Sequence, residues 1–201
     1  MSRISSALLS LVVVVVLLAS VPASAQPFSW FLGVYFYPET TGYVAVPHSS
    51  DFNFTTGFTC EAWVKVTDSA GTCSSITGKK YNTAWWIGVC GTTFRSYIKG
   101  NGSVFDGGTI PANTWAHIAV TYDGTTRRHY VDGEEVGTHA DTGEMGTSTE
   151  ELRIGSDVPF DYRPHGLIDE VRLWSIARSK SDIRSTISIG GQVSKLYFGF
   201  S

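Results

Sequence analysis

Acidic residues stand next to each other at three places in the chain, and paired carboxyl groups could act as acid and base in catalysis. The three pairs are Glu134-Glu135, Glu150-Glu151 and Asp169-Glu170. Retaining glycosidases hold their two carboxyl groups about 5–5.5 Å apart across the bond that is cleaved. Neighbouring residues of a strand point to opposite faces of the sheet, so none of these pairs is predicted to meet that requirement.

The other residue types that could carry chemistry show no catalytic pattern either. No Ser-His-Asp order is recognisable, and the five histidines have none of the spacings of a zinc site. We therefore expect the chain not to be an enzyme. The formal net charge is −3 and the basic residues form no stripe, which argues against nucleic acid as a partner.

The three cysteines are the next candidates for chemistry. Cys73 and Cys90 are equidistant in sequence from a predicted turn at Tyr81-Asn82, so they face each other if the hairpin has no bulge. We predict a disulfide between them; the alternative is a register shift that leaves all three thiols free. Cys60 falls on the apolar side of a predicted strand and is expected to be a buried thiol that packs as a small hydrophobic residue.

Several aromatic residues could stack on the apolar face of a sugar ring. Alternation along the predicted strand places Trp85 in the core and Trp86 on the opposite face. Tyr81 lies in the preceding turn, and Tyr162 and Arg163 lie in a long loop between two later strands. We predict Tyr81, Trp86, Tyr162 and Arg163 as ligand-contacting residues, the alternative being that the aromatic rings pack in the core.

These residues are positioned by a chain of short strands centred on residues 115–138. Two Asp-Gly pairs there, Asp123-Gly124 and Asp132-Gly133, suit the central residues of tight turns, and alternating apolar and polar residues flank both. This pattern predicts a three-stranded antiparallel meander. About a dozen predicted strands make the chain an all-β, two-sheet antiparallel β-sandwich. One short helix is expected at 180–187, because Ser179 and Asp182 resemble a capping box.

Three stretches carry a family resemblance in their order and spacing. They are Trp-x-His-Ile-Ala-x-Thr-Tyr-Asp-Gly at 115–124, Phe-Thr-Cys-Glu-Ala-Trp-Val-Lys at 58–65, and Gly-Leu-Ile-Asp-Glu-Val-Arg-Leu-Trp at 166–174. From about Phe36 onward the chain resembles the laminin-G-like domain of the concanavalin A-like lectin/glucanase superfamily. The resemblance implies a jelly-roll sandwich. The chain lacks the Glu-x-Asp-x-x-Glu run of the glucanase relatives, which supports a non-catalytic role.

The resemblance also implies a possible calcium site. In laminin-G-like relatives the Asp of the Gly-x-Ile-Asp-Glu-Val motif, here Asp169, often helps to hold a structural Ca²⁺ beside the loop after the first strand. This chain lacks the relatives' acidic residues in that loop, so Glu39 and the carbonyl groups near Thr41 would have to replace them. The alternative is that Asp169 caps backbone amides of that loop. Alternation places Asp169 on one face with Leu167, Val171 and Leu173, where an ionised carboxylate needs a partner.

The first 25 residues have the features of a secretory signal peptide. Arg3 supplies the positive charge, residues 7–18 form the apolar stretch, and the Ala-Ser-Ala at 23–25 predicts cleavage before Gln26. Residues 26–201 are then expected to form a single secreted laminin-G-like domain. No later stretch is long and apolar enough to cross a bilayer, so no membrane span is expected in the mature chain.

Taken together, these patterns favour a secreted, non-catalytic binding module that recognises a glycan at a cell surface or on an extracellular polymer. The second hypothesis is a protein-binding adhesion module, since a fold by itself does not specify the ligand. The third is a glucanase-like hydrolase whose motif is not recognisable. An exposed aromatic pair in a groove would favour the first hypothesis. A broad apolar or charged face without a groove would favour the second, and two carboxylates facing each other in a cleft would favour the third.

Overall fold

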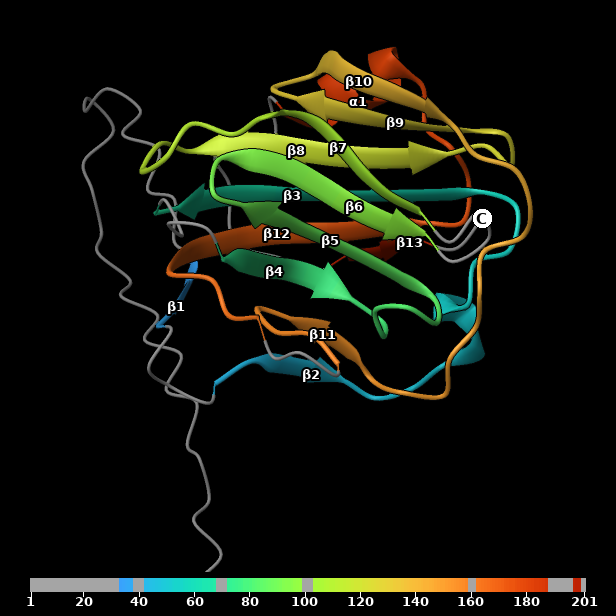
Figure 1. The fold of residues 1–201 in the computed structure, drawn as a ribbon, viewed down its shortest axis with the longest axis horizontal. Coiled ribbons are helices and arrows are strands. Elements are labelled where there is room, and N and C mark those ends of the chain that lie inside the picture. Colours follow the sequence, from blue (N-terminus) through green and yellow to red (C-terminus); the bar gives the residue numbers. More distant parts are fainter. Residues whose placement is uncertain are drawn as a thin grey trace, which may run out of the picture.

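The structure, a computed structural model, is a sandwich of two β-sheets, and in Figure 1 the six-stranded sheet lies in front of the seven-stranded one. It describes residues 33–37, 42–67, 72–98, 103–158, 162–187 and 197–199. The predicted signal peptide, Glu39 and Thr41 lie outside these residues. The β-sandwich prediction is confirmed, and the sheets are antiparallel except where β13 runs parallel to β12.

The larger sheet has the strand order β1-β12-β3-β8-β9-β10, with β13 also pairing with β12. Its strands are β1 (Val34–Phe36), β3 (Phe58–Val66), β8 (Ala116–Tyr122), β9 (Thr126–Val131), β10 (Glu134–Ala140), β12 (Gly166–Trp174) and β13 (Tyr197–Gly199). The smaller sheet has the order β2-β11-β4-β5-β6-β7. Its strands are β2 (Val44–Val46), β4 (Cys73–Gly78), β5 (Trp85–Cys90), β6 (Thr93–Ile98), β7 (Ser103–Thr109) and β11 (Leu152–Ile154).

The core lies between the two sheets and follows the alternation of the sequence. Every second residue of β3 and β8 is buried there, together with Trp85, Ile87 and Val89 of β5. Cys60 is one of these residues; it is a free thiol, and burial raises its pKa well above the ordinary value. It therefore packs as a small hydrophobic residue, as predicted.

The meander of β8, β9 and β10 is confirmed, although one of its turns is displaced. Asp132 and Gly133 both have positive φ and occupy the centre of the β9–β10 turn, as predicted. In the β8–β9 turn the centre is Gly124-Thr125, one residue later than expected. The Asp123 carboxylate causes the shift, because it accepts hydrogen bonds from the backbone N–H groups of Thr125 and Thr126.

The β4–β5 hairpin carries the predicted disulfide, which joins Cys73 to Cys90. The two residues are paired across the strands even though the hairpin has a bulge between Ser75 and Thr77. The loop after β4 is also longer than a two-residue turn, because the Ala84 N–H bonds to the Lys80 carbonyl. The extra bulge residue and the longer loop offset each other, so the register at the cysteines is unchanged.

Strand β12 has a bulge that changes the predicted faces. The pairing with β3 shifts between Asp169 and Arg172, and Glu170 in the bulge has a φ of 48°. The residues on the core side are therefore Ile168, Val171 and Leu173. Asp169 pairs with Trp63 on the opposite side, so the predicted sharing of a face with Val171 and Leu173 is wrong.

Helix α1 (Lys180–Ile187) packs on the outer face of the seven-stranded sheet. Its start is the predicted capping box, since the Asp182 N–H donates to Ser179 Oγ and the Ser179 N–H donates to Asp182 Oδ2. Ile183 packs against Ala119 and Tyr130 of that face. Within the described residues, no helix is long and apolar enough to span a membrane. Helix α1 therefore covers part of the outer face of the larger sheet.

Candidate functional site

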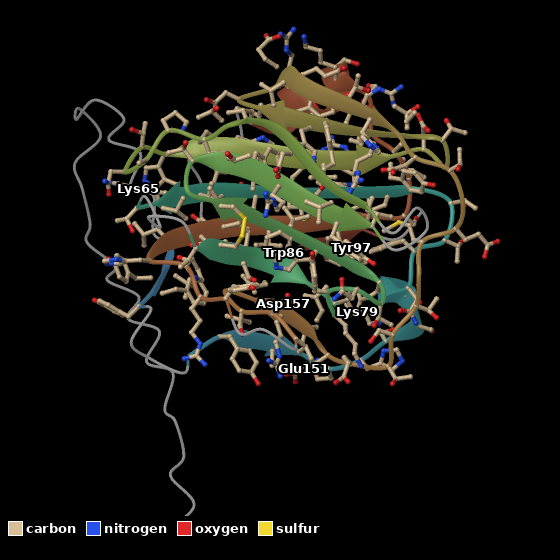
Figure 2. All side chains as sticks on the ribbon, viewed as in Figure 1. Lys65, Lys79, Trp86, Tyr97, Glu151 and Asp157 are labelled. Atoms are coloured by element: carbon tan, nitrogen blue, oxygen red, sulfur yellow. A yellow bond between two sulfur atoms is a disulfide. The ribbon has the colours of Figure 1, made fainter. Side chains whose placement is uncertain are left out.

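An aromatic cluster lies on the outer face of the six-stranded sheet. Trp86 of β5 is paired directly with Tyr97 of β6, so their side chains emerge side by side on the face away from the core. Gly88 lies next to the indole, and a Cβ there would approach the Trp86 ring within 2.3 Å. Figure 2 shows Trp86, Tyr97 and Asp157 near one another on the near face of the molecule.

Tyr81 completes this cluster from the β4–β5 loop. Its ring centre lies 4.7 Å from that of Tyr97 and 5.8 Å from that of Trp86, edge-on to the indole. Lys80 and Asn82 on either side of it both have positive φ, which bends the loop over the sheet. The Trp86 ring N–H donates to Ser75 Oγ at 2.6 Å, so the polar edge of the buried indole is satisfied.

Asp157 connects this loop to the segment that follows β11. Its Oδ1 accepts hydrogen bonds from the backbone N–H groups of Tyr81, at 3.3 Å, and of Val158, at 2.6 Å. The residue is 1% exposed, and its Oδ2 is buried without a hydrogen-bond partner in the described part of the chain. Burial raises the pKa of the Asp157 carboxyl to about 6, although the two amide donors and Arg153 act in the opposite direction.

Tyr162 stands on the same side and is the exposed member of the group. Its backbone carbonyl accepts a hydrogen bond from the Ser75 N–H, so the loop runs alongside β4. Its side chain is 38% exposed. Burial raises the pKa of Tyr81, and the nearby Tyr162 and Asp157 act in the same direction, so residues from two distant loops lie near Tyr81.

An ion pair and the disulfide border the cluster. Arg95 of β6 makes two hydrogen bonds to the Asp106 carboxylate, from Nε at 2.5 Å and from the second terminal nitrogen at 2.7 Å. This bidentate contact lowers the pKa of Asp106. Another Arg95 nitrogen lies 3.8 Å from Cys73 Sγ, so the disulfide lies at the rim of the same face.

Of the four predicted ligand-contacting residues, the structure brings three together. The rings of Tyr81 and Trp86 are in contact and Tyr162 lies near Tyr81, whereas Arg163, which is half-buried, is not placed against these rings by a described contact. Trp86 faces away from the core as predicted but is only 2% exposed. The accessible aromatic surface is therefore supplied by Tyr81 and Tyr162 rather than by Trp86.

The sequence analysis missed Tyr97 and Asp157. Tyr97 could have been found, because a two-residue turn at 91–92 places it opposite Trp86 in the β5–β6 hairpin. Asp157 had no such signal. It is one of several polar residues in a long loop, and its partner Tyr81 is 76 positions away in the sequence.

The adjacent acidic pairs do not form a facing pair of carboxylates. Glu134 pairs with Lys180 and Arg184, Glu150 with Lys80, Glu151 with Arg153, and Glu170 with Arg172. Each of these carboxylates therefore has a basic partner. Their contacts are those of structural ion pairs rather than of an acid–base couple.

Asp169 has a backbone partner within its own strand. Its Oδ1 accepts a hydrogen bond from the Glu170 N–H at 2.8 Å, inside the bulge of β12. Among the described residues, no three His, Cys, Asp or Glu side chains come together as a metal site. The other predicted calcium ligands, Glu39 and Thr41, lie outside the described residues, so the calcium site stays a prediction.

Comparisons with known proteins agree on the fold. A laminin G-like family model, described as the concanavalin A-like lectin/glucanases superfamily, matches residues 38–184. Pappalysin-1 of Mus musculus and that of Homo sapiens are each 31% identical over 83 residues, which is 38% of this chain. The chain matches only 5% of the length of these curated relatives.

Two solved structures have a similar fold. Domain 4 of an extracellular arabinanase from Geobacillus stearothermophilus, in complex with arabinotriose, has a TM-score of 0.57 at 20% identity. That match covers 78% of this chain and 80% of the other. The binding domain of botulinum neurotoxin serotype G has a TM-score of 0.59 at 13% identity and covers 73% and 40% of the two chains. At these levels of sequence identity, the similarity shows a shared fold and nothing more.

Proposed function

The chain belongs to the concanavalin A-like lectin/glucanases superfamily, and from that premise we propose that it is a non-catalytic module that binds carbohydrate. The observation that carries the proposal is the cluster of Tyr81, Tyr97 and Trp86 on the outer face of the six-stranded sheet, with the exposed Tyr162 near Tyr81. Tyrosine combines an apolar ring face with a polar hydroxyl, which suits a ligand that presents both C–H and O–H groups. The oligosaccharide complex of the arabinanase domain supports the same ligand class.

The proposal includes export from the cell. The Cys73–Cys90 disulfide and the laminin G-like fold are compatible with an extracellular domain, because structural disulfides persist in oxidising compartments. In this proposal the predicted signal peptide is removed before Gln26. The partner would then be a glycan on a cell surface or an extracellular polymer.

A glycan array probed with the protein tests this function. We expect binding to neutral oligosaccharides. Tyr81→Ala and Tyr162→Ala should each lower the affinity for the glycan that binds best about tenfold, because each removes a stacking surface. Tyr37→Ala is the matched control, since Tyr37 is also exposed but follows β1 at the edge of the other sheet. An array without any bound glycan, or equal losses in the control, would contradict the assignment.

A protein-binding role is the second candidate, and one surface feature favours it. Val34, Tyr35 and Tyr37 at strand β1 expose 52%, 42% and 52% of their surface. Exposed apolar groups on an edge strand are typical of a surface that pairs with another protein. If this role is the correct one, Val34→Asp should abolish partner capture while Tyr81→Ala leaves it unchanged.

The role of Asp169 can be decided by unfolding measurements with and without calcium. Asp169→Ala is expected to lower the free energy of unfolding by about 1–3 kcal/mol, because the bulge amide of Glu170 loses its acceptor. If Ca²⁺ also binds there, calcium should raise the melting temperature of the parent protein but not that of Asp169→Asn. If Asp169→Ala is as stable as the parent both with and without calcium, Asp169 neither caps the Glu170 amide to any effect nor binds calcium.

A further inference from the structure

We propose that Asp157 determines which saccharides this site accepts: its ionised carboxylate receives hydrogen bonds from ligand hydroxyl or amino groups and repels acidic sugars. The inference rests on the proposed function and specifies its ligand class. It assigns two tasks to one side chain, the positioning of the tyrosine-bearing loops and a direct contact with the ligand.

The positioning task follows from the contacts of Oδ1. This oxygen accepts N–H groups from Tyr81 in the β4–β5 loop and from Val158 after β11. The first loop carries the Tyr81 ring, and the second leads to Tyr162. One carboxylate oxygen thus joins the two loops that hold the accessible aromatic rings.

The ligand-contact task follows from Oδ2. A buried carboxylate oxygen normally has a hydrogen-bond partner, because leaving it unpaired costs free energy. Among the residues that the structure describes, Oδ2 has no such partner, and the contact from Arg153 Nη1 goes to the backbone carbonyl of Asp157, at 3.4 Å. A ligand hydroxyl would supply the missing donor. In this proposal the ligand displaces the groups that bury Oδ2.

The charges around the site set the ligand class. In the described part of the chain, the groups that face Asp157 are Arg153 of β11 and Tyr81, with Tyr162 beside Tyr81. Arg153 is engaged with Glu151, and Arg95 is engaged with Asp106. Both guanidinium groups are therefore already paired with carboxylates, whereas a carboxylate acceptor is available. This arrangement suits neutral or amino sugars and disfavours uronates and sulfated sugars.

The buried charge also provides a readout that separates binding from stability. Burial raises the pKa of Asp157 above its unfolded value, so ionisation destabilises the fold, and stability falls as pH rises from about 4 to about 6. Asparagine in this position avoids that cost and keeps an oxygen for the two amides. Asp157→Asn should therefore melt no lower than the parent protein at pH 7, although it loses a ligand contact.

The test compares the parent protein with Asp157→Asn on neutral, amino, uronate and sulfated oligosaccharides between pH 5 and pH 7.5. The parent should bind neutral or amino sugars, and its affinity should fall about tenfold as pH drops from 7.5 to 5, since the ionised acceptor is then a minor form. The Asn variant should bind at least about tenfold more weakly at pH 7.5 and lose this pH dependence.

Each other outcome identifies which inference fails. If the parent binds no saccharide, the proposed function fails and this inference with it. If the parent binds neutral sugars and Asp157→Asn has the same affinity and pH profile, only the role of Asp157 is overturned. Binding of acidic sugars by the parent overturns it as well. A loss of binding with a lower melting temperature would leave Asp157 only a structural role, which also contradicts the proposal.

Discussion

Replacement of Arg127 by alanine is expected to lower the free energy of unfolding by about 3–5 kcal/mol, because it leaves a buried carboxylate without its counter-charge. Arg127 is fully buried, and its Nε lies 2.6 Å from Oδ2 of Asp141, which is 1% exposed. The guanidinium also donates to Ser96 Oγ at 3.2 Å and lies over the Phe105 ring. These contacts tie β9 to β6 and β7 inside the sandwich.

The next residue in the chain provides the matched control. Arg128 points to the opposite side of β9 and pairs with Asp123, and both side chains are about one third exposed. Arg128→Ala should therefore cost no more than about 1 kcal/mol. Urea unfolding of both variants measures the difference, and equal losses at the two positions would contradict the buried-pair argument.

A double variant keeps this prediction testable if Arg127→Ala does not fold. Arg127→Met with Asp141→Leu removes both charges, so no unpaired ion remains in the interior. This double variant should be more stable than Arg127→Met alone. If the single and double variants are equally unstable, the loss arises from altered packing and not from the stranded charge.

Acidification is expected to cost the fold about 4–5 kcal/mol through His129 alone. The ring is buried between Phe94 and Phe105, and burial lowers the pKa of His129 from its ordinary value to about 3. Its Nδ1 lies 2.9 Å from the Gly107 carbonyl and must carry the proton, since a carbonyl only accepts. Its Nε2, 2.7 Å from Ser96 Oγ, then accepts from that hydroxyl.

The sign of the effect follows from where the proton binds. The unfolded chain takes up a proton at His129 below about pH 6.5, whereas the folded chain does so only near pH 3. Between these values the unfolded state holds more protons, so the contribution of His129 to stability is complete above pH 6.5 and is lost as pH falls toward 3. Asp157 acts in the opposite direction between about pH 4 and pH 6.

His129→Gln isolates this contribution, because Asp157 and the other acids titrate equally in both proteins. The variant should be less stable than the parent at pH 7, since the amide only partly replaces the two ring hydrogen bonds. The difference in the free energy of urea unfolding between the parent and His129→Gln should become smaller as pH falls from 7 to 4. Parallel pH profiles for the two proteins would show that His129 does not control the acid response.

The sequence by itself determined the features that depend on local periodicity. The period of two along β5 placed Trp85 in the core and Trp86 outside it, and the Asp132-Gly133 turn was recognised from the need for positive φ. The cysteine pairing was also correct, although its premise of a hairpin without a bulge was wrong: the bulge between Ser75 and Thr77 and the longer loop offset each other. The family resemblance came instead from the residues of three motifs, and both the family and the sandwich are confirmed.

Only the tertiary structure decided where alternation is interrupted and which distant residues meet. The bulge at Glu170 moved Asp169 away from the core-facing residues of β12, and no local residue pattern had indicated it. The contact of Asp157 with Tyr81 and the pair of Arg127 with Asp141 join segments that are separate in the sequence. Such contacts depend on how the loops and sheets pack. A buried charge is tolerated only at a position where the folded chain supplies its partners, and strand periodicity carries no information about those partners.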